Sequence, residues 1–220
     1  MKVYLDNGST SFPKPKAVAD SIYNYLINNG GNPGRSNHEK SLEANRILYD
    51  TRNEICDFFN FKKTENVIFT NNITSSLNIL INGFIKDGDH IITSSMEHNA
   101  VIRPLYNLSQ DLNIKLDIAQ ANSQGLVDIN SIKYLIKPNT KLIIITHAST
   151  VTGSIQPIKD IGKLCKENNI FFILDSAQSA GVLDIDFEEF FLDALAFTGH
   201  KSLLGPQGIG GFIINNKLNE

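Results

Sequence analysis

The feature that most restricts the fold of this 220-residue chain is a regular alternation between two kinds of segment. Short apolar runs rich in β-branched residues recur, and segments with helical spacing of apolar residues lie between most of them. The runs are predicted strands at residues 67–70, 90–94, 114–119, 141–146, 170–175, 194–199 and 211–215. Because strands that alternate with helices need crossover connections, the sequence predicts an α/β three-layer sandwich with a mostly parallel central sheet.

The predicted helices can be recognised by their capping residues, by the residues that end them and by their apolar faces. They cover residues 45–59, 74–85, 128–136 and 158–168. Asp128 is a predicted N-cap, and Pro138 ends the helix that follows it. The runs 141–146 and 170–175 are apolar at nearly every position, which is typical of strands covered on both faces. The Gly/Asn/Pro-rich stretch 28–38 is predicted to be one long loop, and its length favours a function.

Charge and composition exclude several classes of protein. The net charge of −3, without a run of basic residues, argues against nucleic-acid binding. No apolar stretch approaches the roughly 18 residues needed to span a bilayer, and the start of the chain turns polar too early for a signal peptide. Cys56 and Cys165 match no metal spacing and lie on apolar helix faces, so we expect inert thiols in a reduced, cytoplasmic setting.

Polar groups gather directly after the predicted strands. Ligands of parallel sheets bind beyond the carboxyl ends of the strands, so these positions are the candidate site. They carry an acid, histidines, a lysine, an amide and several hydroxyls, within residues 70–74, 97–98, 147–152, 175–178 and 198–201. The sequence therefore predicts one polar site at this edge of the sheet.

Lys201 and Asp175 stand out in this set. Lys201 follows a Gly-His step at the end of a predicted buried strand, and a desolvated amine is available for Schiff-base formation. Asp175 ends another buried strand, where a carboxylate needs a cation or several donors. The plainer alternatives are a solvated surface lysine and an aspartate that caps a helix. Together, a lysine and a strand-end carboxylate are typical of pyridoxal phosphate (PLP) chemistry.

Two further positions fit a phosphorylated, planar cofactor. Thr74 lies where a helix is predicted to begin, and the free N–H groups of a helix start suit a phosphate, although Asn72 or Thr74 can also be a cap there. His98 lies at a similar turn, where its ring can stack on a planar cofactor or act as a structural hydrogen-bonding group. The glycines of 205–211 precede a strand, which is the wrong order for a dinucleotide-binding fingerprint, and indicate a tight loop.

At this point the sequence resembles a known family, the class V aminotransferases of PLP fold type I, in particular the cysteine desulfurase and selenocysteine lyase branch. Seven ordered motifs carry the resemblance: "YLDNGST" (4–10), "GNPGRSNH" (31–38), "IFTNNITSSLN" (68–78), "MEHNAVIRPL" (96–105), "THASTVTG" (146–153), "DSAQSAG" (175–181) and "TGHKSLLGPQGIGG" (198–211). They extend over nearly the whole chain, so they indicate the family far more strongly than any one of them alone.

The resemblance implies a role for each candidate residue. Lys201 would bind the cofactor aldehyde covalently and later move the α-proton, and His98 would stack on the ring. Asp175 would hold the ring nitrogen protonated, and Gln178 would hydrogen-bond the ring hydroxyl. The phosphate would be bound by Thr74, Thr198 and His200.

Two departures from the family pattern stand out. Thr150, near the expected ring hydroxyl and substrate, stands where the family usually has asparagine. The sequence stops at Glu220, whereas family members continue through a C-terminal small domain that carries a substrate-binding arginine and a mobile cysteine. We therefore expect residues 1–12 to be an N-terminal segment in contact with the small domain or a dimer partner, and residues 13–220 to be an incomplete PLP-binding large domain.

The function implied is that of a PLP-dependent transferase or lyase of the cysteine desulfurase type, which converts L-cysteine into alanine and an enzyme persulfide. The resemblance also implies a cytoplasmic homodimer, an amino-acid substrate and a sulfur-acceptor protein, with no nucleic-acid or membrane partner. Two alternatives remain open. One is another class V activity, such as selenocysteine lyase or transaminase. The other is a truncated PLP-binding or scaffold module without turnover.

Overall fold

The seven predicted strands form one sheet in the computed structural model, which describes residues 3–34 and 37–216. Residues 1–2 and 217–220, at the ends of the two expected domains, lie outside the described residues. So do residues 35–36, which belong to the predicted loop 28–38 and to the second of the seven motifs, 31–38. Each strand matches its prediction to within one residue at either end. The strands are β1 (Val67–Thr70), β2 (His90–Ser94), β3 (Lys115–Ala119), β4 (Thr140–Thr146), β5 (Phe171–Asp175), β6 (Ala194–Thr198) and β7 (Gly210–Ile214).

The sheet is mostly parallel, as predicted. Its order is β1-β7-β6-β5-β4-β2-β3, and β7 pairs antiparallel with both β1 and β6, whereas the other neighbours are parallel. The reversal at β7 confirms that residues 205–211 return the chain after the lysine motif. As a result, the carboxyl ends of β2, β4, β5 and β6 share one edge of the sheet.

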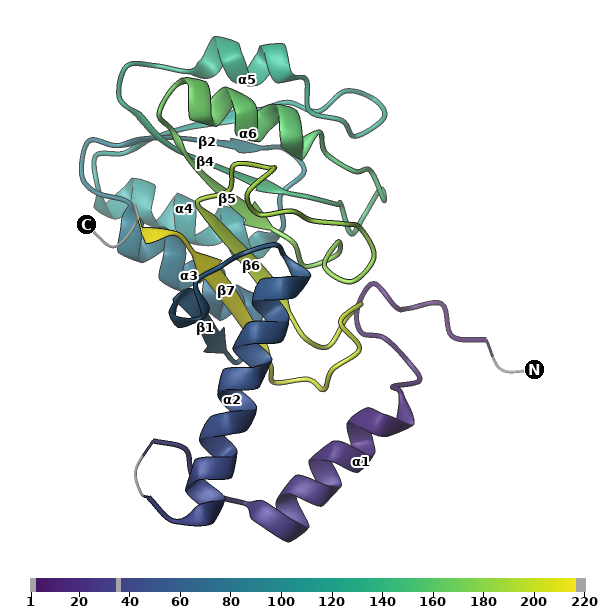
Figure 1. Ribbon diagram of the computed structural model, residues 1–220. Helices are drawn as coiled ribbons and strands as arrows, with labels where there is room; N and C mark the ends of the chain where they lie inside the picture. The colour runs from purple at the N-terminus through teal and green to yellow at the C-terminus, as the bar shows by residue number, and fades with distance from the viewer. Residues whose placement is uncertain (1–2, 35–36, 217–220) are drawn as a thin grey trace.

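Helices cover both faces of this sheet (Figure 1). Those of the main body are α3 (Ile73–Phe84), α4 (Asn99–Asp111), α5 (Ile129–Leu135) and α6 (Ile158–Glu167), with a short 3-10 turn η2 (Thr64–Asn66) before β1. The buried side chains form two clusters, one between the sheet and α3 and α4, the other between the sheet and α5, α6 and the end of the long helix α2 (Glu39–Phe58). The three-layer architecture is therefore confirmed.

Strand β4 shows why its sequence is apolar at successive positions. Leu142 and Ile144 belong to the cluster under α3 and α4, whereas Ile143 and Ile145 belong to the opposite cluster. All four side chains are fully buried. Alternate residues of a strand point to opposite faces, so a strand covered on both sides needs apolar residues throughout.

The N-terminal part was not predicted as helix. Helix α1 (Lys16–Asn24) continues into the π-helical turn η1 (Tyr25–Asn29), and α1 buries none of its residues. Figure 1 shows α1 and the first half of α2 standing away from the sheet. Asn28 and Asn29 are thus helical, and the loop predicted for 28–38 begins only at Gly30, whose left-handed conformation ends η1.

Candidate active site

The polar groups at the strand ends surround one cavity of about 210 Å³. Five of the eight predicted site residues line it, namely His98, Thr150, Asp175, Gln178 and Lys201. The lining comes from the segments that follow β2, β4, β5 and β6, together with Ile73 from the start of α3. The prediction that strand-end residues distant in sequence meet at one edge of the sheet is confirmed.

Asp175 is the buried acid of this cavity, with 2% of its surface exposed. Its Oδ1 atom accepts a hydrogen bond from the backbone N–H of Ala177 at 2.9 Å. Burial raises the pKa of Asp175, while this hydrogen bond and the charges of His98 and Lys201 oppose the increase. A turn rather than a helix follows β5, so Asp175 is not a helix cap. A carboxyl group held in this way favours a cationic partner.

Lys201 is half-buried in the loop after β6. Burial lowers the pKa of its ammonium group, and the charge of Asp175 opposes that decrease. Lys201 is therefore not a freely solvated surface lysine. An amine with a lowered pKa is a better nucleophile at neutral pH, because more of it is unprotonated.

The N-terminal segment fixes the backbone beside Lys201, which the sequence alone did not reveal. The carbonyl oxygen of His200 accepts from Ser11 N at 3.1 Å, Thr10 Oγ1 at 3.0 Å and Lys14 Nζ at 2.6 Å. The carbonyl oxygen of Lys201 accepts from Ser11 Oγ at 2.8 Å. These partners lie about 190 positions apart, and no local pattern signals a contact over that separation.

Gln178 makes a second contact to the N-terminal segment. Its Nε2 donates to the carbonyl oxygen of Gly8 at 3.0 Å, and its side chain also lines the cavity. Gly181, at the end of the same loop, has a left-handed φ of +92°, and a Cβ there would lie 2.5 Å from the carbonyl oxygen of Ser202. Glycine at position 181 therefore lets the Asp175–Gln178 loop approach the loop that carries Lys201.

The three predicted phosphate-binding residues are next to the cavity and are not part of its lining. Thr198 Oγ1 and His200 Nδ1 are buried, and within the described residues neither has a hydrogen-bond partner. Thr74 is exposed in the first turn of α3, where backbone N–H groups have no partner inside the helix. Asn72 is the N-cap, since its side chain accepts from Ser75 N at 2.8 Å.

Strand β7 holds these phosphate-binding candidates together. Gly210 pairs with Thr198, and a Cβ on Gly210 would lie 2.6 Å from the backbone carbonyl carbon of Asn72. Only glycine permits β7 to lie this close to the start of α3. The arrangement thus brings unpartnered donors and acceptors to the first turn of a helix, which suits an anion such as phosphate.

His98 and Thr150 reach the cavity from two other loops. His98 is the N-cap of α4, and its Nδ1 accepts from Ala100 N at 3.1 Å, so the neutral ring carries its proton on Nε2. Its side chain is exposed toward the cavity that it lines. Thr150 is exposed too, in the loop after β4. Both side chains are therefore accessible to a ligand.

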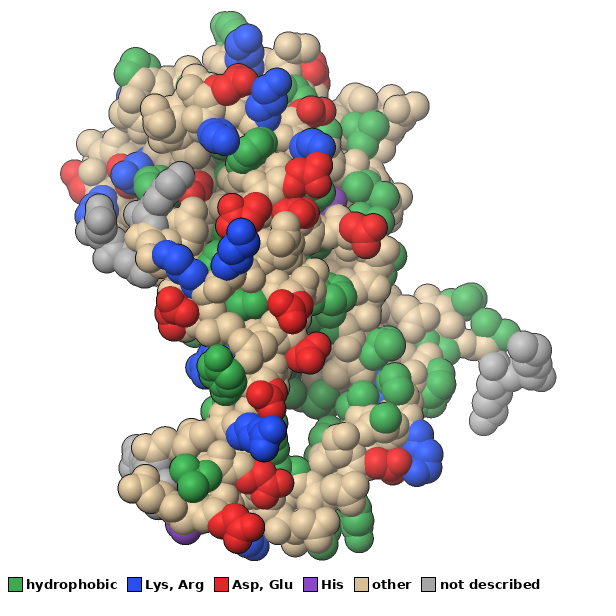
Figure 2. Space-filling model, viewed as in Figure 1, with side chains coloured by type: hydrophobic (Ala, Val, Ile, Leu, Met, Phe, Trp, Pro, Cys, Tyr) green, Lys and Arg blue, Asp and Glu red, His purple; other side chains and the backbone are tan. Residues whose placement is uncertain are grey.

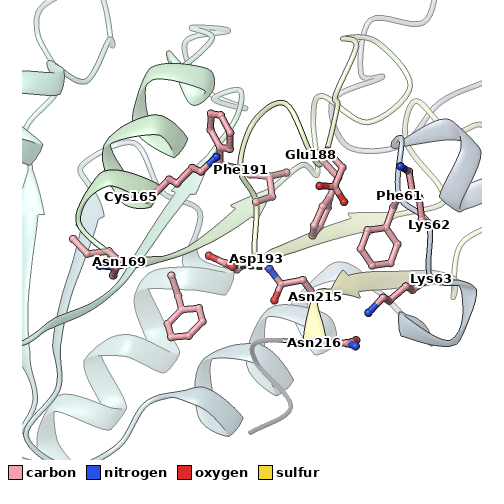
Figure 3. A pocket seen from close by; sticks show the side chains of 15 residues that line it. Phe61, Lys62, Lys63, Cys165, Asn169, Glu188, Phe191, Asp193, Asn215 and Asn216 are labelled. Atoms are coloured by element: carbon pink, nitrogen blue, oxygen red, sulfur yellow. Dashed lines mark hydrogen bonds between the residues drawn. The ribbon is translucent and has the colours of Figure 1, made fainter.

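A larger cavity of about 810 Å³ lies at the opposite edge of the sheet, near the amino ends of β5 and β6 (Figure 3). Asn215 Nδ2 donates to Asp193 Oδ1 at 2.6 Å across it. Cys165 lines this cavity, but its thiol is buried, and burial raises its pKa. Burial also raises the pKa of Cys56. Both cysteines are free and buried, as predicted, and their raised pKa values disfavour the reactive thiolate.

Residues 3–34 and 37–216 hold no group of three or more His, Cys, Asp or Glu side chains that is arranged to bind a metal ion. Within the same ranges, each helix is too short or too polar to cross a membrane.

Comparisons with known proteins agree with these observations. The chain is 35% identical over 99% of its length to a probable cysteine desulfurase of Borreliella burgdorferi, of which it covers 52%. The apo cysteine desulfurase of Thermococcus onnurineus NA1 superimposes with a TM-score of 0.93 at 32% identity, over 98% of this chain and 54% of that one. The structure of SspA in complex with cysteine gives a TM-score of 0.91 at 30% identity, over 98% of this chain and 62% of that one.

The chain spans about half the length of the curated relatives that it matches. It matches the Aminotransferase class-V family over residues 3–220, which includes every strand and helix described above. By this match, its fold and its similar relatives, the chain belongs to the class V aminotransferase family.

Proposed function

We propose that the protein is a PLP-dependent cysteine desulfurase-like enzyme, of which this chain is the cofactor-binding large domain. The observation that carries the proposal is the pairing of a half-buried Lys201 with a buried Asp175 in one cavity. The reaction proposed is release of sulfur from L-cysteine, which leaves alanine and a persulfide on an enzyme cysteine. The names of the similar proteins support this substrate, and one of them is a complex with cysteine.

The residues present fit PLP. The unpartnered atoms Thr198 Oγ1 and His200 Nδ1 suit a phosphate beside the start of α3, where Thr74 lies. When bound, PLP supplies an electron sink that stabilises negative charge at the α-carbon of an amino acid. Asp175 would hold the ring nitrogen, and Lys201 would hold the aldehyde.

The predicted site residues that line the cavity each have a defined part in this proposal. Lys201, with its lowered pKa, would accept the α-proton of the amino acid. His98 would present its ring face to the cofactor ring, and Gln178 and Thr150 would bind its hydroxyl group and orient the substrate. Asparagine is longer than threonine and carries an amide, so Thr150 leaves more room at this position.

The assembly proposed is a cytoplasmic homodimer that delivers sulfur to an acceptor protein. Residues 1–12 would contact the small domain or the partner subunit, and residues 13–220 would form the large domain. Support comes from exposed apolar side chains in the N-terminal segment, such as Leu5 at 90% and Phe12 at 63% exposure. The two free, buried cysteines suit a reducing compartment.

The cofactor assignment is tested by adding PLP to the purified protein and recording the visible absorption of lysine-bound PLP. We expect this band in the wild type and its loss in Lys201→Ala, because no other lysine lines the cavity within the described residues. Lys16→Ala, which removes an exposed lysine paired with Asp20, is the control and should keep the band. A band that survives Lys201→Ala contradicts the assignment.

The reaction is tested separately in the full-length protein, which supplies the cysteine that accepts sulfur, by measuring sulfide and alanine formed from cysteine in the presence of a thiol reductant. Both products should form in the wild type and be absent in Lys201→Ala. Bound PLP without either product would favour another class V activity, such as selenocysteine lyase or transaminase, or a module without turnover.

A further inference from the structure

Glu97 is a second carboxyl group of the candidate site, to which neither the motif comparison nor the proposed reaction gives a role. It lines the cavity directly before His98. Its Oε1 atom accepts from Ser94 Oγ at 2.6 Å and from the backbone N–H of Thr146 at 3.0 Å. Ser94 ends β2 and Thr146 ends β4, so one carboxyl oxygen joins two strand ends.

This link extends to Asp175. Thr146 is the register partner of Asp175 in the β4–β5 pair, and His147 N donates to the carbonyl oxygen of Asp175 at 2.9 Å. Glu97 thus holds Thr146, and Thr146 in turn pairs with Asp175 at the end of β5.

The second oxygen of Glu97, Oε2, is buried and has no hydrogen-bond partner in the described part of the chain. Two carboxylates in one buried site repel each other, so one of them retains its proton. Burial raises the pKa of Glu97 to about 8, against the hydrogen bonds from Ser94 and Thr146, and the charge of Asp175 adds to the increase. Since Oε1 accepts two hydrogen bonds, the proton belongs on Oε2.

We propose that Glu97 is a positioning residue of the cofactor site that works in its protonated form. Its Oε1 fixes the ends of β2 and β4, and its neutral carboxyl leaves Asp175 as the one carboxylate among the described residues that line the cavity. A single negative charge then faces the single positive charge of a protonated ring nitrogen. The identity of this ligand rests on the proposed function, whereas the protonation of Glu97 does not.

The other titratable groups around Glu97 also affect how PLP affinity depends on pH. Those that line the cavity are His98 beside it, Asp175 after β5 and Lys201 after β6. His147, next to Thr146, turns its ring toward Phe190, and burial lowers its pKa to about 4. A comparison of the wild type with Glu97→Gln cancels their contributions, because the amide has the same shape and cannot ionise.

The test measures PLP affinity against pH for the wild type, Glu97→Gln, Glu97→Ala and the control Glu167→Gln, which changes an exposed carboxylate at the end of α6. Below pH 8, Glu97→Gln should bind within about threefold of the wild type, since it keeps a neutral acceptor for Thr146. Above the pKa of about 8, the ratio of wild-type to Glu97→Gln affinity should change, because ionised Glu97 places a second negative charge in the cavity. Glu97→Ala should bind about 10- to 100-fold more weakly at all pH values, because it leaves Thr146 N–H unpaired.

A second readout needs no cofactor. The infrared difference spectrum between the apo wild type and Glu97→Gln should show the carbonyl band of a protonated carboxylic acid at neutral pH, and Glu167→Gln should not. Absence of this band, or a ratio of wild-type to Glu97→Gln affinity that is constant across pH 8, overturns the inference. If the wild type fails to bind PLP, the proposed function fails and the infrared comparison still decides the protonation of Glu97. If Glu97→Ala does not fold, the Glu97→Gln comparison stands alone.

Discussion

At the scale of single residues, burial disfavours the charged form of several titratable groups in the candidate site. Burial raises the pKa of Asp175 and lowers the pKa values of Lys201 and His200. Each shift means that the folded protein disfavours the charged form of that group relative to the unfolded chain. A ligand with a cationic ring nitrogen and an anionic phosphate would supply the missing countercharges. Such a ligand stabilises the folded protein by an amount that grows with the logarithm of its concentration above the dissociation constant.

Asp175→Asn should separate the stability of the apo protein from cofactor binding. Because the folded-state pKa of Asp175 is raised, the ionised carboxylate costs stability above the ordinary carboxyl pKa. The amide removes this cost and can still accept from Ala177 N. We expect the unfolding free energy of the apo variant at neutral pH to equal or exceed that of the wild type, and the difference to shrink as the pH is lowered. PLP affinity should fall by about 1.5–3 kcal/mol.

Denaturant unfolding with and without PLP measures both quantities in one series. An apo variant less stable than the wild type, or one that binds PLP equally well, would contradict this account of Asp175.

At the scale of elements, the strands could be predicted and the N-terminal helix could not, for physical reasons. Strands such as β4 and β5 are covered on both faces, which leaves a continuous apolar run in the sequence. Asp128 and Asn72 act as N-caps because their side chains accept from backbone N–H groups, and such caps are local signals. Helix α1 buries no side chain against the sheet, so no burial pattern distinguishes it from a loop.

The candidate site was predictable to a similar extent. Topology brings strand ends to one edge, so Asp175, Lys201 and His98 could be found from the pattern of strands alone. The hydrogen bonds that Thr10 and Ser11 donate to the backbone of His200 and Lys201 could not be predicted, because they depend on the tertiary path of the chain. Glu97 was visible as a strand-end acid, but its protonation follows only from its burial beside Asp175.

Two glycines linked to α3 give a matched test of how β7 positions this helix. A Cβ on Gly210 would lie 2.6 Å from a backbone atom of Asn72, whereas a Cβ on Gly83, an exposed residue inside α3, would meet nothing within 4 Å. Gly210→Ala should destabilise the protein by about 1–3 kcal/mol, through forced separation of β7 and α3. Gly83→Ala should instead stabilise it by about 0.5–1 kcal/mol.

Thermal unfolding of both variants measures these changes, and PLP titration reports on the phosphate side of the site. Only Gly210→Ala should weaken PLP binding. Equal effects of the two substitutions would show that the close approach of β7 to Asn72 is not important.

At the scale of the whole molecule, apolar side chains gather on the N-terminal arm, which we define as residues 3–29. Figure 2 shows hydrophobic side chains over this part of the surface. Tyr23, Leu26 and Ile27 are 64%, 68% and 64% exposed. Exposed apolar side chains gathered on one part of a surface favour an interaction there. It supports the proposed homodimer, in which a second copy of the chain covers the arm.

Leu26→Glu should weaken that association, because it places a charge in an apolar contact. We expect the midpoint of dimer dissociation, measured by sedimentation or light scattering against protein concentration, to move to higher concentration. Tyr134→Glu is the control, since Tyr134 is 90% exposed on α5, away from the arm. An unchanged midpoint in Leu26→Glu would place the dimer contact elsewhere.

The bonds between Ser11 and the lysine loop have a consequence for biosynthesis. Ser11 leaves the ribosome before Lys201, whose carbonyl oxygen it binds and which is made 190 residues later. Contacts between such distant positions form late, because the loop between them must first be closed. The nascent chain therefore contains most of its sheet before Ser11 can hold the loop that carries Lys201. Capture of the cofactor would then follow the formation of most of this sheet and would not guide its beginning.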